Sequence, residues 1–296
     1  MKSLVIINGY PNGEKFLRQG ERIAEELRRL GVQVDVIKNG DVSVLLEGDG
    51  CVQCTLKEKY SFAVYLDKDK YLGRMLEMAG LPLFNCAEAI EICDDKMLTY
   101  LALRAAGVSL AKTIPAPLCY TPNATPKLSF LQRVAEEIHF PLIAKKSYGS
   151  FGAGVRLIYD MVALQETERE WLHIPHLYQE YIEESAGRDV RVIVIGGKAI
   201  AAMERVAQDG EFRSNVELGG QGRRIVLEEA YQKAAEMAAK ALRLDYCGVD
   251  LLKGKNGPIV CEVNSNAFFE GLERVTGTNV AKAYAEYILG HLTEKV

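Results

Sequence analysis

The sequence predicts an α/β protein that begins with a small parallel sheet and continues in β-rich layers. Two observations lead to this class. Short apolar runs alternate with helix-periodic segments through residues 4–84, and glycine-rich turns join strand-like runs at residues 147–154 and 196–197. The 296 residues are 48% hydrophobic and 26% charged, which suits a core large enough for two or three subdomains.

The charge balance and the cysteines narrow the function classes. A formal net charge of −4 disfavours a nucleic-acid surface, and no apolar run reaches the length of a membrane span. The apolar start at residues 4–7 is too short for a signal peptide. Seven scattered cysteines favour free thiols in a reducing, cytoplasmic setting. Cys51 and Cys54 form a lone CxxC without the further ligands of a zinc site, so a redox or metal role is not favoured.

The first part of the chain alternates four strand-like runs with two helical patterns. These segments are residues 4–7, 16–30, 32–36, 62–66, 72–79 and 81–84. Gly31 and Gly80 stand where each helix should end. Such alternation predicts a small parallel sheet with helices on both faces. A dinucleotide site at residues 8–13 is an alternative, but the segment lacks GxGxxG.

A helical pattern at residues 94–106 opens the next part. Asn85, Asp94 and Asp95 have the residue types of helix N-caps. Lys96 falls in the first turn, where a cation opposes the helix dipole. A lysine placed against this local preference can serve a ligand. The alternative is an ordinary solvated lysine. Three prolines within residues 113–123 then predict a loop between subdomains.

A glycine-rich turn between two strands follows this loop. The strand at residues 140–146 ends in Lys145 and Lys146, whose side chains should point to opposite faces. The turn at residues 147–154 can lie over phosphates with its backbone N–H groups as donors, although GxxxxGK[ST] is absent. The strand at residues 177–183 offers a backbone edge that suits a purine.

Polar side chains gather on the last predicted hairpin, at residues 247–266. A strand period of two puts Glu262 and Asn264 on one face, and Asp250 joins them if the two strands pair. Carboxylate and amide oxygens suit Mg²⁺ that is held together with nucleotide phosphates. The alternative is an exposed hairpin whose outer face is merely polar.

In order, these parts describe a nucleoside triphosphate clamped between two β-rich layers. The order and five sequence pieces resemble the ATP-grasp superfamily, and in detail the RimK-like α-L-glutamate ligases. The resemblance is close from Asp94 onward and holds in outline before it. The pieces are Asp94-Asp95-Lys96, Gln179-Glu180-Tyr181-Ile182, Phe212-Arg213-Ser214-Asn215, Gly248-Val249-Asp250, and Glu262-Val263-Asn264 with Glu270-Gly271.

This resemblance implies an ATP-grasp fold of the α/β (α+β) class with an N-terminal Rossmann-like pre-ATP-grasp domain. It divides the chain into an N-terminal domain at residues 1–94, a central subdomain with a glycine-rich lid at 95–183, and a C-terminal subdomain with the metal site at 184–296. It also implies a carboxylate–amine ligase that uses ATP and two Mg²⁺ or Mn²⁺ ions and forms an amide through an acyl phosphate.

The resemblance further implies roles for individual residues. Residues that would hold ATP are Lys96, Lys145, Ser150, Gly152, Glu180, Tyr181, Asp189, Arg213, Ser214 and Asn215. The two lysines would contact phosphates, Glu180 and Tyr181 would hold adenine through backbone groups, and Asp189 would lie on the ribose side. Lys145 and Arg213 would be the catalytic residues. The metal ligands would be Asp250, Glu262 and Asn264, with Glu262 bridging the ions.

Two segments depart from the family pattern. The lid at residues 147–154 is bulkier than Gly-Thr-Gln-Gly, and residues 265–269 lack Ala-Ser-Pro-Gly-Leu. Both lie where substrates would approach, so ATP binding is expected while the amino acid stays open. Glutamate is favoured, with an amine- or carboxylate-bearing acceptor, and self-association is compatible with the sequence. The alternatives are another ATP-grasp ligase, such as a dipeptide ligase, and a non-catalytic ATP-binding regulatory protein.

Overall fold

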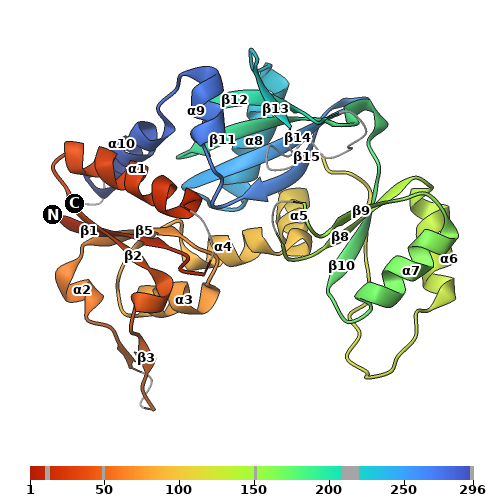
Figure 1. Ribbon diagram of the computed structural model, residues 1–296, viewed down its shortest axis with the longest axis horizontal. Helices are drawn as coiled ribbons and strands as arrows, with labels where there is room; N and C mark the ends of the chain where they lie inside the picture. The colour runs from red at the N-terminus through yellow and green to blue at the C-terminus, as the bar shows by residue number, and fades with distance from the viewer. Residues whose placement is uncertain (11–13, 49–50, 150–151, 209–219, 294–296) are drawn as a thin grey trace.

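The computed structural model describes residues 1–10, 14–48, 51–149, 152–208 and 220–293. Three main sheets follow one another along the longest dimension of the molecule (Figure 1). The first and third sheets are joined by packed helices. The second sheet lies at the far end and is reached through α4 (Ala87–Asp94) and α5 (Lys96–Ala105).

The first sheet is parallel, as the sequence predicts. Its strand order is β2-β1-β5-β6, and every neighbouring pair runs in the same direction. The strands are β1 (Lys2–Ile7), β2 (Gln33–Lys38), β5 (Phe62–Leu66) and β6 (Leu83–Phe84). The helices of this region are α1 (Lys15–Arg29), α2 (Leu56–Lys59) and α3 (Lys70–Met78).

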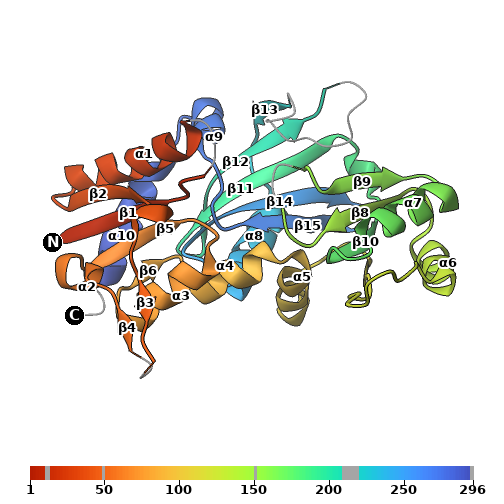
Figure 2. The same ribbon diagram turned by 60° about the horizontal axis from the view of Figure 1, so that its bottom comes forward.

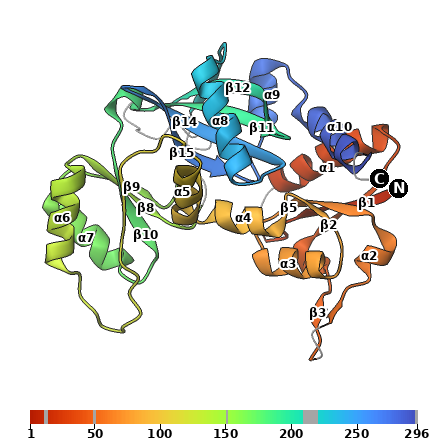
Figure 3. The same cartoon turned by 180° about the vertical axis from the view of Figure 1, so that it is seen from behind.

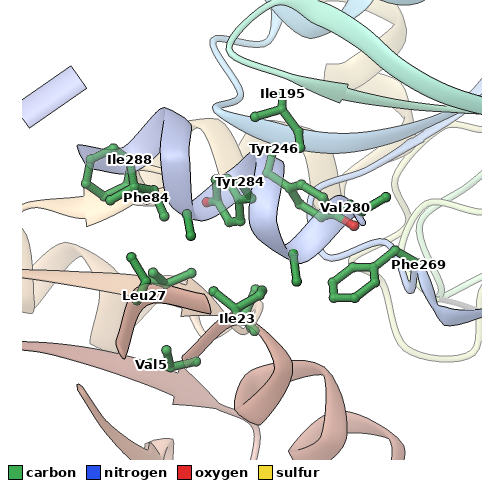
Figure 4. Close-up of a cluster of buried hydrophobic side chains, with 14 of the residues drawn as sticks. Val5, Ile23, Leu27, Phe84, Ile195, Tyr246, Phe269, Val280, Tyr284 and Ile288 are labelled. Carbon is green, nitrogen blue, oxygen red and sulfur yellow. The ribbon is translucent and has the colours of Figure 1, made fainter. Parts of the chain in front are cut away.

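Helices cover both faces of this sheet. Val5 and Ile7 pack in one core with α1, whereas Leu4 and Ile6 pack in another with α3 and α4. The last helix, α10 (Val280–Thr293), returns to the first face. Figure 4 shows its buried side chains against those of α1 and β1, with residues of the third sheet beside them. The end of the chain therefore joins the first sheet to the third.

The second sheet is antiparallel and has the order β7-β10-β8-β9. Its strands are β7 (Thr113–Pro115), β8 (Leu142–Lys146), β9 (Val155–Ile158) and β10 (His176–Glu180). Helices α6 (Leu128–Ile138) and α7 (Met161–Trp171) pack against Leu142, Ala144 and Tyr178 on one face. Because strand side chains alternate, Ile143, Lys145 and Gln179 are left for the opposite face.

The third sheet has the order β13-β12-β11-β14-β15 and is also antiparallel. Its strands are β11 (Arg188–Ile195), β12 (Lys198–Val206), β13 (Gln221–Arg224), β14 (Tyr246–Gly254) and β15 (Gly257–Asn264). Helix α8 (Glu229–Ala241) covers the face that carries Val192, Val249 and Leu251, and Figure 3 shows it from behind. Helix α9 (Glu270–Thr276) follows β15. The predicted hairpins β11/β12 and β14/β15 are confirmed.

Smaller elements complete the fold. A two-stranded hairpin of β3 (Leu45–Leu46) and β4 (Val52–Gln53) projects from the first sheet (Figure 1). Short 3₁₀ turns lie at Asn39–Asp41 and Glu183–Ser185. All seven cysteines are free thiols. Within the described ranges, every helix is too short or too polar to cross a bilayer.

Two of the three predicted helix caps, Asn85 and Asp94, are wrong. Cys86, not Asn85, holds the N-cap position of α4. The buried Asn85 side chain instead donates to the carbonyls of Tyr246 and Ser265 at 2.8 and 3.0 Å, and accepts from the Tyr246 N–H at 3.0 Å. It therefore links the first sheet to the third. Asp95 does cap α5, through the N–H groups of its first turn, whereas Asp94 is the last residue of α4.

Candidate active site

Two adjoining cavities lie on the inner face of the third sheet. The first, called here the nucleotide cleft, lies between the second and third sheets, which face each other in Figure 2. The second, called here the substrate cavity, has a volume of about 480 Å³ and lies between the first and third sheets. Arg205 and Glu262 line both cavities. The two spaces therefore meet at the hairpin that carries the predicted metal ligands.

A buried lysine forms one wall of the nucleotide cleft. Lys145 is 7% exposed, and its Nζ donates to Gln179 Oε1 at 2.7 Å and lies 3.4 Å from the Tyr100 hydroxyl. Among the described residues, no carboxylate forms an ion pair with it. Burial alone would lower the pKa of Lys145, but Cys261, Tyr100 and Glu262 outweigh burial and raise it. The lysine is therefore a buried cation held by neutral acceptors and poised for an anion.

The other predicted lysine connects the lid to β15. Lys96 begins α5, and its Nζ lies 3.2 Å from the Gly149 carbonyl and 3.5 Å from Glu262 Oε1. Its backbone N–H donates to the Ser147 carbonyl at 3.1 Å. Lys146, on the opposite face of β8, has its Nζ 5.1 Å from the Trp171 ring centroid. As the strand period predicts, the two lysines leave β8 on opposite faces, although both contribute atoms to the lining of the cleft.

The β14/β15 hairpin brings the predicted metal ligands together. Asp250 lies directly opposite Glu262, and Asn264 pairs with Gly248 two positions further along the same face. The Nδ2 atom of Asn264 is buried and has no hydrogen-bond partner among the described residues. Two carboxylates and one amide oxygen form a donor set of the type that Mg²⁺ takes together with phosphate oxygens.

This set is incomplete as a metal cage on its own. Across the described parts of the chain, no three side chains of His, Cys, Asp or Glu gather closely enough to hold an ion. Mg²⁺ characteristically binds through one or two carboxylates plus substrate phosphates. The residues present therefore fit a magnesium–nucleotide complex better than a free metal ion.

Two arginines engage Asp250. Arg191 on β11 pairs with both of its carboxylate oxygens, and Arg205 on β12 reaches Oδ2 at 2.9 Å. Arg205 also donates to both oxygens of Asp189, at 2.7 and 2.5 Å. Burial alone would raise the pKa of Asp250, but the two guanidiniums outweigh burial and hold it below its ordinary value. Asp250 therefore stays ionised, as a metal ligand must.

The end of β10 supplies the remaining predicted nucleotide contacts. Glu180 and Tyr181 line the nucleotide cleft together with Gly152 and Asp189. The Glu180 side chain accepts from the Lys112 N–H at 2.8 Å, and its own N–H donates to the Lys112 carbonyl at 3.0 Å. Its carboxylate and N–H are thus used within the protein. Ser150, Arg213, Ser214 and Asn215 lie outside the described residues.

Sequence reasoning missed several residues of these cavities. Tyr100 and Gln179 position Lys145. Gln179 stands in a quoted sequence piece but received no role, and no local pattern marks Tyr100 because its partners are distant in the chain. Asn8 and Asp67 line the substrate cavity. A signal for these two was present, since each directly follows a strand of a parallel sheet, and ligands bind at the carboxyl ends of such strands.

Comparison with known proteins agrees with this geometry. A family model described as the RimK-like ATP-grasp domain matches residues 94–288. A probable alpha-L-glutamate ligase of Enterobacter sp. (strain 638) is 36% identical over 222 residues, which cover 74% of this chain and 71% of that protein. Beta-citrylglutamate synthase B of Danio rerio is 34% identical over 235 residues, which cover 79% of this chain and 56% of that protein.

A solved structure extends the likeness to the whole fold. The RimK domain protein ATP-grasp from Sphaerobacter thermophilus DSM 20745 has a TM-score of 0.71 and 17% identity, over 97% of this chain and 99% of that one. The fold is therefore that of the ATP-grasp ligases, as predicted. The chain belongs to the RimK-like ATP-grasp family, a class of ligases that use ATP to form amide bonds.

Proposed function

We propose that this protein joins a carboxylate to an amine through an acyl phosphate, with glutamate as the favoured amino acid. One observation carries the proposal. Lys145 is buried, forms no ion pair with a carboxylate of the described chain, and lies in the same cleft as the Asp250–Glu262 pair. A cation on one wall and adjacent carboxylates on the other suit a triphosphate with its magnesium. The glutamate preference is supported by the relative named a glutamate ligase.

Within the cleft, we assign ATP to residues of the second and third sheets and of the segments that adjoin them. Lys96 and Lys145 would bind phosphates, and the lid residues Ser150 and Gly152 would cover them. Since the Glu180 N–H is used by Lys112, an adenine contact at Glu180 would use its carbonyl, with Tyr181 beside it. We keep the remaining predicted assignments as part of this proposal: Asp189 for the ribose side, and Arg213, Ser214 and Asn215 near the phosphates.

Asp250, Glu262 and Asn264 would hold two Mg²⁺ or Mn²⁺ ions, with Glu262 bridging them. When bound, the metal ions would neutralise charge that builds up between the β- and γ-phosphates. Arg191 and Arg205 keep Asp250 ionised and fix its orientation. The protein's contribution is therefore mostly positioning and preorganised charge, and it needs no nucleophilic side chain.

The chemical steps follow from the need to replace a poor leaving group. A carboxylate oxygen attacks the γ-phosphorus, the bond to the β-phosphate oxygen breaks, and ADP leaves. The amine then attacks the acyl carbon, phosphate leaves, and the amine loses a proton. Lys145 and Arg213 would stabilise the transferring phosphoryl group, since two anions approach each other in the first step. We propose that the substrate cavity receives the molecules that meet there.

The test is ADP release with Mg-ATP across a panel of amino acids, each with and without amine- or carboxylate-bearing acceptors. Release that requires an amino acid and an acceptor together supports the ligase. Glutamate dependence supports the favoured substrate, whereas dependence on another amino acid moves the specificity. ATP binding without release under every condition would contradict catalysis and favour a regulatory ATP-binding protein.

We propose a cytoplasmic location, supported by ATP dependence and by seven free cysteines. We keep the division into residues 1–94, 95–183 and 184–296, supported by one main sheet in each part. Self-association stays a proposal, to be tested by light scattering.

A further inference from the structure

One wall of the substrate cavity comes from the N-terminal part of the chain, and none of its residues has yet been given a role. Asn8 and Asp67 belong to this wall, whereas Asn264 and Arg274 come from the C-terminal part of the chain. Because Glu262 lines both this cavity and the nucleotide cleft, a molecule held here lies beside the proposed metal site. Side chains of the N-terminal wall are therefore placed to select what reacts.

Three carboxylates line this cavity, and they differ in their partners. Glu262 and Glu270 each lie within 3.5 Å of a basic side chain. Asp67 accepts hydrogen bonds only from neutral donors, Asn8 Nδ2 at 2.9 Å and the Lys68 backbone N–H at 2.7 Å. In the part of the chain that the structure describes, no basic side chain forms an ion pair with Asp67. It is thus the carboxylate that has a place for a cation.

The environment of Asp67 disfavours a bare carboxylate. The residue is 3% exposed, and its Oδ2 atom is buried without a hydrogen-bond partner among the described residues. Burial raises the pKa of its carboxyl, and the hydrogen bonds from Asn8 and the Lys68 backbone only partly offset this. A buried carboxylate is stabilised when a cation or a hydrogen-bond donor reaches it. A ligand ammonium would supply both.

The position in the fold also points to a ligand. Asn8 and Asp67 directly follow β1 and β5, which are neighbours in the parallel sheet. The carboxyl ends of parallel strands are where ligands bind in such sheets. The C-terminal part of the wall adds the exposed Arg274, for which the described chain provides no ion pair. Lys15, Lys68, Arg191 and Arg205 also line the cavity, but Asp67 on one wall and Arg274 on the other form no ion pair within the described chain, and such an acid and guanidinium match a zwitterion.

We infer that Asp67, oriented by Asn8, binds the ammonium group of the amino-acid substrate in the substrate cavity. This inference rests on the proposed function and names the group by which the enzyme recognises its amino acid. Asp67 is then a specificity residue that distinguishes an amino acid from the same acid without its amine. Binding of the ATP phosphates, in the neighbouring nucleotide cleft, does not depend on Asp67.

The experiment compares binding of each amino acid with binding of the acid in which hydrogen replaces the ammonium, for example glutamate against glutarate. Calorimetry is done on the full chain with Mg²⁺ and a non-hydrolysable ATP analogue. The native protein should prefer the amino acid by roughly 10- to 100-fold, the usual value of a hydrogen bond to a charged group. Asp67→Asn should lose that preference and keep its affinity for the nucleotide analogue.

Asp69→Asn is the matched control, because it makes the same change two residues away and outside the cavity lining. Asp69 caps α3 through the Tyr71 and Leu72 N–H groups, and asparagine caps equally well. This variant should keep the preference. Should Asp67→Asn fail to fold, as judged by nucleotide binding, Asp67→Ser takes its place.

Two results would overturn the inference: a folded Asp67 variant that keeps the preference, or a native protein that binds no amino acid better than its deamino partner. Failure of the proposed function has a different signature. A preference that depends on Asp67, with no ADP release under any condition, would contradict the ligase while leaving this ammonium site in place.

Discussion

Replacing Glu262 by Gln should separate turnover from folding. The side chain is 32% exposed, and its Oε1 lies 3.5 Å from Lys96 Nζ. An ion pair at this distance and exposure contributes about 0–1 kcal/mol to stability. The melting temperature should therefore change by only a few degrees. Removing one electrostatic donor from a reaction centre costs roughly 100- to 1,000-fold in kcat, or about 2.7–4 kcal/mol. Loss of a bridging metal ligand should cost at least this much.

The assay is ADP release by native protein and Glu262→Gln with the substrates found in the panel, together with thermal unfolding. A second readout is the Mg²⁺ dependence of binding of a non-hydrolysable ATP analogue, which should weaken in the variant. Glu91→Gln is the matched control, since Glu91 is 28% exposed, pairs with Arg74 at 2.5 Å and lines neither cavity. Retention of more than a tenth of the native kcat, or an equal loss in Glu91→Gln, would refute the metal assignment.

Three further predictions concern single side chains. Lys145→Met should weaken binding of Mg-ATP about 10- to 100-fold in calorimetry while the protein stays folded, and unchanged affinity would contradict the phosphate role. Gly196→Ala should destabilise the protein by about 2–5 kcal/mol in urea unfolding, because its φ is +56° and a Cβ would lie 2.5 Å from the Tyr287 ring. Gly197→Ala is the control and should cost only about 1–2 kcal/mol, because open space surrounds that position. Burial opposes ionisation of Glu168, but hydrogen bonds from a histidine and a tyrosine outweigh burial and lower its pKa. The ionised Glu168 therefore stabilises the fold above pH about 4.3, and this contribution is lost as the pH falls through the lowered pKa. When the free energy of unfolding is measured against pH, Glu168→Gln should reduce the loss of stability at acid pH. An unchanged loss would show that other groups cause it.

Local sequence patterns were enough for the strands of the first sheet and the two hairpins of the third, but not for helices α6 and α7 or for strand β7, which lies in the predicted loop. The apolar run at residues 62–66 is strand β5 with the same bounds. Gly31, Gly80 and Gly107 follow the ends of three predicted helices with φ near +80°. The hairpin pairing that places Asp250 opposite Glu262 follows from strand alternation and a short turn. These features depend on neighbours a few residues apart, where side-chain period and glycine conformation act directly.

Partners that are distant in the chain were decided only by the tertiary structure. Asn85 has the residue type of a helix cap, yet its amide bonds to Tyr246 and Ser265, 161 and 180 residues away. The acceptors around Lys145 and the buried position of Asp67 likewise arise where separate sheets meet. A side chain's charge state and free hydrogen-bonding capacity depend on burial and on the groups that packing brings to it. The sequence could therefore predict residues that line the nucleotide cleft, whereas the substrate cavity exists only once the first and third sheets pack together.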